Sequence, residues 1–310
     1  MIEREPSVIT AADGHRIPLR CWMPSAGARP AIIVQVLHGL GEHVGRYRRF
    51  AAACCERGFA VIGHDHRGHG PDCDPVHLGH FADRNGWDKV VGDAIAVQRF
   101  ARKTRPGTPI VLFGHSMGSF IAQSAAAREP GTIKALILSA STLGSRRQVR
   151  TGRLLTWLLM ARSGGRRRSP LPNRLGFGSF NKRFAPNRTD FDWLSRDAAE
   201  VDKYIADPHC GMPLSNRLWH DLLGGLLEVS SIRRLRRVPL ALPILITGGD
   251  DDPLGGSRGQ RRLARAYEST GHIDVALKLY PHGRHEMLNE IDRDEFTRDV
   301  LRWIDHKGAS

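Results

Sequence analysis

The chain has 310 residues and a formal net charge of +14, from 46 Lys and Arg against 32 Asp and Glu, which makes anionic lipid or nucleic acid conceivable partners. Its length suits one large core with an insertion, and five cysteines without a C-x-x-C pair argue against a disulfide framework or a zinc site. Acidic residues near the N-terminus and the lack of a long apolar run argue against a signal peptide and a membrane span, so we expect a soluble, cytoplasmic protein.

Strands and helices alternate along most of the chain. The first two strands, 7–10 and 17–22, flank an Asp13-Gly14 turn and form a predicted hairpin. Apolar runs predict further strands at 31–37, 59–63, 109–113, 134–138, 242–247 and 273–280. Helical spacing follows at 47–57, 87–104, 258–269 and 292–305. This order predicts an α/β fold, a mostly parallel sheet covered by helices on both faces.

The alternation stops between the strands at 134–138 and 242–247. Residues 141–238 are helical and arginine-rich, and we expect them to form a cap inserted into a core made of 1–140 and 239–310. The doublet Gly224-Gly225 within this stretch favours a flexible bend.

One part of the expected cap combines charge with apolar surface. Eight arginines and no acid lie between Ser145 and Ser169, around a nearly all-apolar helix at 154–160. We expect these unpaired arginines to dock the cap peripherally on the anionic inner membrane surface. The alternative is that the helix packs inward and the arginines are merely solvated.

Gly114-His115-Ser116-Met117-Gly118 is the most informative motif. It follows the strand at 109–113 and precedes an apolar helical stretch, the context of a nucleophile elbow. A serine in such a tight turn needs neighbours without side chains two residues away on either side. Ser116 is therefore the candidate nucleophile.

A serine hydroxyl needs a base and an acid that orients this base, and on such a fold they follow it in the order acid, then histidine. Asp250, Asp251 and Asp252 follow the strand at 242–247, and His282 and His285 follow the last strand. The residues alone leave open which aspartate and which histidine act.

Backbone N–H groups should stabilise the oxyanion of the tetrahedral intermediate. The N–H of Met117 follows the nucleophile, and the loop His38-Gly39-Leu40-Gly41 offers the N–H of Leu40. The sequence Asp65-His66-Arg67-Gly68-His69-Gly70 supplies an acid and two histidines within five residues, which makes a metal site an alternative there.

The elbow, the His38–His43 loop, residues 65–70 and Asp252-Pro253 together resemble the α/β-hydrolase family that includes monoacylglycerol lipases, lysophospholipases and serine aminopeptidase-like (S33) hydrolases. The likeness covers nearly the whole chain, including residues 194–208 of the expected cap. It implies an α/β-hydrolase fold with no cofactor and no metal, and a charged loop at 65–70 that braces the oxyanion strand. It further implies Ser116 as nucleophile, Asp252 as acid, His285 as base, and Leu40 and Met117 as oxyanion donors.

We therefore expect a serine hydrolase that cleaves carboxylic esters of lipid type, with monoacylglycerol or lysophospholipid as the substrates that the resemblance implies. One alternative is an aminopeptidase or amidase, in which Glu200, Asp202 or Asp207 would hold a free amine. The other is a non-catalytic protein on the same fold that binds anionic membrane. No nucleic-acid motif is present, so we expect no nucleic-acid partner. Acyl chain length, head group and oligomeric state stay open.

Overall fold

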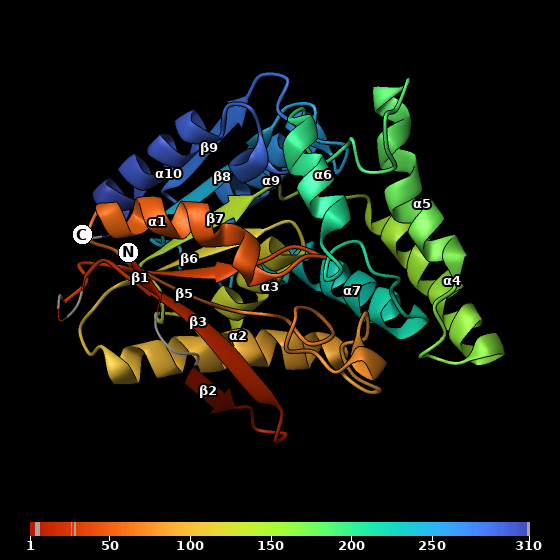
Figure 1. Cartoon of the computed structure of the whole chain (residues 1–310), viewed down its shortest axis with the longest axis horizontal. Helices are drawn as coiled ribbons and strands as arrows, with labels where there is room; N and C mark the ends of the chain where they lie inside the picture. The colour runs from red at the N-terminus through yellow and green to blue at the C-terminus, as the bar shows by residue number, and fades with distance from the viewer. Residues whose placement is uncertain (4–6, 26, 28, 309–310) are drawn as a thin grey trace.

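The computed structural model describes residues 1–3, 7–25, 27 and 29–308 (Figure 1). Their strands form one sheet, in the order β1-β3-β5-β4-β6-β7-β8-β9, with β2 paired to β3. Neighbours from β5 to β9 in this order are parallel, and β1, β2 and β5 are antiparallel to β3. The strands are β1 (Ile2–Glu3), β2 (Ser7–Thr10), β3 (Arg16–Met23), β4 (Ile33–Leu37), β5 (Ala60–His64), β6 (Ile110–His115), β7 (Ala135–Ser139), β8 (Ile244–Gly249) and β9 (Val275–Tyr280). This confirms the predicted α/β fold and its N-terminal hairpin.

Helices cover both faces of the sheet, because successive residues of the central strands point to opposite sides. In β4, Ile33 and Leu37 belong to one buried cluster, and Val34 and Val36 belong to the other. The first cluster includes residues of α2 (Gly86–Thr104), α3 (Met117–Arg128) and α9 (Gly256–Ser269). The second includes α1 (Arg48–Glu56) and α10 (Arg293–Lys307), which lie side by side above the sheet in Figure 1.

The described residues between β7 and β8 form helices joined by loops and add no strand to the sheet. Helix α7 packs against α2, α3 and α4, whereas α4 and α5 form the outer edge of the molecule in Figure 1. The division into a core and a cap at residues 141 and 238 stays a prediction. The helices are α4 (Arg146–Ser163), α5 (Pro170–Phe180), α6 (Ala198–Ala206), α7 (Asn216–Val229) and α8 (Ile232–Leu235).

The prediction of a bend at Gly224-Gly225 is wrong, because α7 runs through both residues. A Cβ on Gly225 would lie 2.1 Å from the Trp87 ring of α2, so this glycine allows the two helices to approach closely. None of the helices in the described part of the chain has the length and apolar character needed to span a bilayer.

Candidate active site

Ser116 lies in the turn between β6 and α3, at the edge of the sheet where the carboxyl ends of the parallel strands meet. Its φ of 51° is unusual for a residue with a side chain, and such strain concentrates at functional sites. A Cβ on Gly114 would lie 2.5 Å from the Gly118 carbonyl oxygen, and one on Gly118 would lie 2.0 Å from that of Leu37. The two glycines therefore permit the turn, as the sequence predicts.

A chain of two hydrogen bonds joins Ser116 to side chains that follow β8 and β9. His285 Nε2 lies 2.9 Å from Ser116 Oγ, and His285 Nδ1 lies 2.9 Å from Asp252 Oδ1. His285 and Asp252 are 4% and 2% exposed, so the chain is shielded from water on the acid side. The arrangement allows the imidazole to accept the serine proton while the carboxylate fixes its orientation.

The other aspartates and His282 have different partners. The backbone N–H of His282 donates to Asp250 Oδ1 at 2.7 Å, and Arg183 pairs with Asp251 at 2.6 Å. The side chain of His282 is 80% exposed. Of the five candidates, only Asp252 and His285 belong to the hydrogen-bonded chain with Ser116.

The charges around His285 favour its protonation. Burial alone would lower the pKa of His285, but the carboxylate of Asp252 and its hydrogen bond outweigh burial and raise it. His115 lies beside it, with ring centroids 5.0 Å apart, and burial lowers the pKa of His115 to about 4. His115 is therefore neutral near pH 7.

Leu40 and Met117 both line the cavity that contains Ser116. Met117 is the first residue of α3, so its N–H has no acceptor within the helix. Leu40 follows Gly39, at which a Cβ would lie 3.4 Å from the Ser116 Cβ, so the loop passes directly beside the serine. Its far end is held at Gly41, whose carbonyl oxygen accepts from Gly211 N at 2.9 Å and Tyr204 Oη at 2.8 Å.

The loop at residues 65–70 braces this region, as the family resemblance implies. The backbone N–H of His66 donates to His38 Nε2 at 2.9 Å, and the N–H of Val44 donates to Asp65 Oδ1 at 2.7 Å. Arg67 pairs with Asp93 at 2.7 Å. Among the described residues, no three side chains of this loop come together in a geometry that could hold a metal ion.

A buried ionic network that no sequence pattern indicated lies beside the serine. Arg46 pairs with Glu42 at 2.7 Å and with Glu286 at 2.6 Å, and its guanidinium lies 4.9 Å from the centroid of the Tyr204 ring. Glu42 also accepts from Tyr47 Oη at 2.8 Å. Glu42 and Arg46 are four residues apart, but no sequence signal connects them to Glu286.

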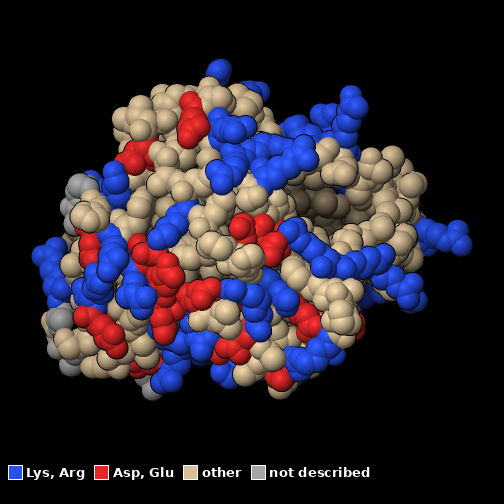
Figure 2. All heavy atoms as spheres, turned by 90° about the horizontal axis from the view of Figure 1, so that it is seen from above, with Lys and Arg blue, Asp and Glu red and all other residues tan. Residues whose placement is uncertain are grey.

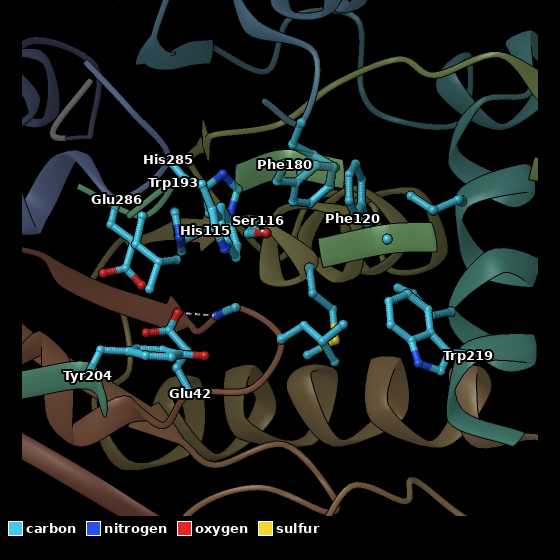
Figure 3. A pocket seen from close by; sticks show the side chains of 18 residues that line it. Glu42, His115, Ser116, Phe120, Phe180, Trp193, Tyr204, Trp219, His285 and Glu286 are labelled. Carbon is cyan, nitrogen blue, oxygen red and sulfur yellow. Dashed lines mark hydrogen bonds between the residues drawn. The ribbon is translucent and has the colours of Figure 1, made fainter. Parts of the chain in front are cut away.

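The cavity above Ser116 has a volume of about 180 Å³ and two chemically different sides. Figure 3 shows Glu42, Tyr204 and Glu286 on one side of Ser116, and Phe120 and Trp219 on the other. Trp193 contacts the catalytic region directly, with its ring centroid 5.0 Å from that of His285. The apolar lining comprises Leu40, Met117, Phe120, Phe180, Trp193, Leu194, Trp219, Leu222, Leu226 and Leu254.

The acids proposed to hold a free amine are paired elsewhere. Glu200 pairs with Arg49 at 3.0 Å, Asp202 with Arg188 at 2.7 Å, and Asp207 with His43 at 2.8 Å. In the described part of the chain none of the three lines the cavity. These contacts weaken the aminopeptidase alternative, which requires one of these three acids to hold the free amine.

Comparison with known proteins shows the family of the chain. Residues 28–292 match the model of the family "Serine aminopeptidase, S33". Monoglyceride lipase of Rattus norvegicus is 30% identical over 96% of this chain and 89% of its own length. Monoacylglycerol lipase of Mycolicibacterium smegmatis is 30% identical over 94% of this chain and 93% of its own. The crystal structure of a thermostable carboxyl esterase from Bacillus coagulans, in complex with glycerol, superposes with a TM-score of 0.90 at 27% identity and covers 99% of both chains.

Fold and site thus define an ester hydrolase with the α/β-hydrolase fold. Within that class, the chain belongs to the serine aminopeptidase S33 family. The sequence motifs indicated a resemblance to the same family.

Proposed function

We propose that the protein hydrolyses carboxylic esters of lipid type, with monoacylglycerol or lysophospholipid as substrates, through Ser116, His285 and Asp252. The observation that carries this proposal is the hydrogen-bonded chain of these residues in a cavity with one polar and one apolar side. Relatives named monoglyceride and monoacylglycerol lipase support the same substrate class.

In the first half of the reaction, Ser116 Oγ attacks the ester carbonyl while His285 Nε2 takes its proton. Asp252 stabilises the imidazolium that forms. The N–H groups of Leu40 and Met117 donate to the oxyanion of the tetrahedral intermediate. The intermediate collapses when His285 returns the proton to the leaving alcohol, and the acyl group stays on Ser116.

In the second half, water enters where the alcohol has left. His285 takes a proton from this water, which attacks the acyl carbonyl through a second oxyanion intermediate. The proton returns to Ser116 Oγ as the carboxylic acid departs. No cofactor is needed for either step.

The two sides of the cavity suit an amphipathic ester. The hydroxyl groups of a glycerol head can bond with polar atoms near Glu42, Glu286 and Tyr204, whereas an acyl chain gains contact with Phe120, Trp219 and Leu222. Arg46 balances only part of the negative charge of the two glutamates. This side therefore favours groups that donate hydrogen bonds, such as the hydroxyl groups of glycerol.

A substrate panel tests the proposal. We expect 1-monoacylglycerols and lysophosphatidylcholine to be hydrolysed with a higher kcat/KM than an acetyl ester, because each buried CH₂ is worth about 0.8 kcal/mol. An aminoacyl naphthylamide measures the peptidase alternative. Higher kcat/KM on the naphthylamide than on every acyl ester would contradict the proposal.

We further propose that α4 docks peripherally on anionic membrane. Leu154, Trp157 and Leu158 are 57%, 52% and 51% exposed, which is unusual for such large apolar side chains. Their spacing places them on one face of the helix, together with exposed Arg147 and Arg150. Figure 2 shows Lys and Arg side chains around a hollow in this part of the surface.

The expectation that all arginines of this segment are unpaired is wrong. Arg166 pairs with Asp83 at 2.8 Å, and Arg146 and Arg168 donate to the carbonyl oxygens of Leu227 and Leu78. The inward-packing alternative describes the opposite face of α4, where Thr156 is 2% exposed and α7 lies against the helix. The docking face is thus limited to the outer side of α4.

A further inference from the structure

Three metal-ligating side chains meet outside the catalytic chain, where the turn after α6 contacts the loop after β4. An imidazole nitrogen of His43, a carboxylate oxygen of Asp207 and Sγ of Cys210 all lie within 4.8 Å of one another. All three residues are partly exposed, so an ion can reach them from solvent. We propose that they bind one zinc-class divalent cation, and that this ion slows the hydrolase by shifting the loop that contains Leu40.

The donor set suits zinc. One thiolate, one imidazole and one carboxylate match the ligands that Zn²⁺ takes, at about 2.0–2.3 Å in tetrahedral geometry. Tetrahedral ligands at these lengths are roughly 3.3–3.5 Å apart. His43 Nε2 and Asp207 Oδ2 are 2.8 Å apart, so these two atoms would have to separate slightly around a metal ion. Cys210 Sγ, which lies within 4.8 Å of a ligand atom of each of the two residues, would have to move closer to them.

Two of the ligands come from one tight turn. The backbone N–H of Cys210 donates to Asp207 O at 3.0 Å, which fixes the three-residue spacing of the two donors. His209 lies between them, and its Nδ1 is buried without a hydrogen-bond partner among the described residues. Its ring centroid is 6.2 Å from that of His43, so His209 would have to move to reach the ion, and a water molecule supplies the fourth ligand.

The surrounding charge favours a cation. The charged groups around the Cys210 thiol include the guanidinium of Arg46 and the carboxylates of Glu42, Asp207 and Glu286. The metal takes the place of the thiol proton, which is released to solvent on binding. The dication then faces one thiolate and one carboxylate, which neutralise it.

The turn that contains Asp207 and Cys210 lies against the loop at residues 38–41, which contains Leu40. Gly211 N and Tyr204 Oη both donate to the carbonyl oxygen of Gly41, two residues before His43 and next to Leu40. A metal that draws Cys210 toward His43 therefore moves the turn against this loop. Because an oxyanion donor must lie within hydrogen-bond reach of the reacting oxygen, a small shift of Leu40 lowers the rate.

Cobalt titration tests the site without reference to activity. We expect metal-free protein to bind one Co²⁺ with a thiolate-to-cobalt charge-transfer band, and Zn²⁺ to displace this band. Cys210→Ser should lose the band and bind zinc at least about tenfold more weakly, since even indirect partners of a metal are worth this much. Cys73→Ser, which removes another half-exposed thiol beside Asp72 and Asp74, should retain both. No band in the unaltered protein, or an equal band in Cys210→Ser, would overturn the proposal.

The coupling to hydrolysis rests on the proposed function and has its own readout. Zn²⁺ should slow hydrolysis of a short soluble ester several-fold, EDTA should restore the rate, and Cys210→Ser should be insensitive relative to its own zinc-free rate. A cobalt band with an unchanged rate would overturn the coupling. A protein without esterase activity but with the cobalt band would contradict the proposed function and leave the metal site standing.

Discussion

At the scale of single residues, three consecutive aspartates differ in the groups that they contact. Asp252 is 2% exposed and hydrogen-bonds to His285, whereas Asp251 pairs with Arg183 at the surface and Asp250 accepts from the backbone of His282. The three side chains have the same intrinsic acidity. Only the direction in which the turn after β8 points each of them separates their roles.

Replacement of each aspartate by asparagine tests this assignment. Asp252→Asn should lower kcat by about 10⁴, because an amide favours the wrong imidazole tautomer. Asp251→Asn should change kcat little, since it removes only a surface ion pair. Steady-state hydrolysis of a soluble ester by the three variants measures this. A larger loss in Asp250→Asn than in Asp252→Asn would contradict it.

The pH dependence of hydrolysis follows from His285. Its pKa lies above the ordinary value of 6.5, and only the neutral imidazole can accept the Ser116 proton. We therefore expect kcat/KM to rise with pH, with a midpoint above 6.5, and to fall as pH drops through that midpoint.

The same reasoning predicts the effect of a neighbouring charge. Glu286 is among the groups that raise the pKa of His285, so Glu286→Gln should move the midpoint of the kcat/KM profile to lower pH. The profile of Glu268→Gln, which removes a carboxylate from the exposed surface of α9 away from the cavity, serves as a reference for remote charge. A midpoint in Glu286→Gln that stays in place or rises would be inconsistent with this cause.

At this scale the sequence predicted the residues that belong to a short contiguous motif. The elbow identifies Ser116 because strand, glycines and helix are contiguous. Asp252 and His285 needed a family resemblance, since their neighbours are chemically equivalent. The Glu42–Arg46–Glu286 network was missed because Glu286 lies 240 residues from Arg46 in the chain and the contact exists only in the folded protein.

At the scale of secondary structure, close approach between α3 and β4 supports the elbow. A Cβ on Gly118 would lie 2.0 Å from the Leu37 carbonyl oxygen, a backbone atom that cannot move aside cheaply. Gly118 therefore allows α3, which begins with Met117, to lie close to β4, which ends just before the loop that contains Leu40.

Gly118→Ala should lower the free energy of unfolding by about 3 kcal/mol and greatly reduce hydrolysis, because the added methyl group forces α3 away from β4. Gly92→Ala in α2 is the matched control, since nothing lies within 4 Å of its Cβ position. It should stabilise the protein by about 0.5–1 kcal/mol through helix propensity. Urea denaturation measures both, and equal stabilities of the two variants would refute this packing.

The periodicity of apolar residues predicted most elements, with ends displaced by a few residues. Strand 109–113 extends to His115 in the structure, because pairing with β7 continues beyond the apolar run. The two-residue β1 was missed, since so short a strand has no pattern of its own and exists through its pairing with β3. The bend expected at Gly224-Gly225 failed because packing against Trp87 outweighs the intrinsic flexibility of glycine.

At the scale of the whole molecule, the outer face of α4 is the surface that we propose docks on membrane. Replacement of Arg147, Arg150 and Arg162 by glutamine should reduce binding to phosphatidylglycerol vesicles, because each basic residue near an anionic surface is worth about 1 kcal/mol. Kinetics on a small soluble ester should not change. Co-sedimentation at low and moderate salt measures the binding, which salt should weaken.

The control removes the same charge from another part of the surface. Arg261, Arg265 and Arg298 are exposed on α9 and α10, and their triple glutamine variant should bind vesicles nearly as well as the unaltered protein. Equal losses in both triple variants would indicate a response to net charge and not to α4. Negligible sedimentation of all three proteins would refute docking altogether.

The central claim, that Ser116 is the nucleophile of this hydrolase, is tested most directly by labelling with a fluorophosphonate followed by peptide mass spectrometry. We predict one adduct per chain, located on Ser116, and none in Ser116→Ala, which should fold with an unchanged Tm while kcat falls by about 10⁴–10⁶. His285→Ala should label slowly, whereas His282→Ala should label like the unaltered protein. An adduct on another residue, or undiminished labelling of Ser116→Ala, would contradict the account.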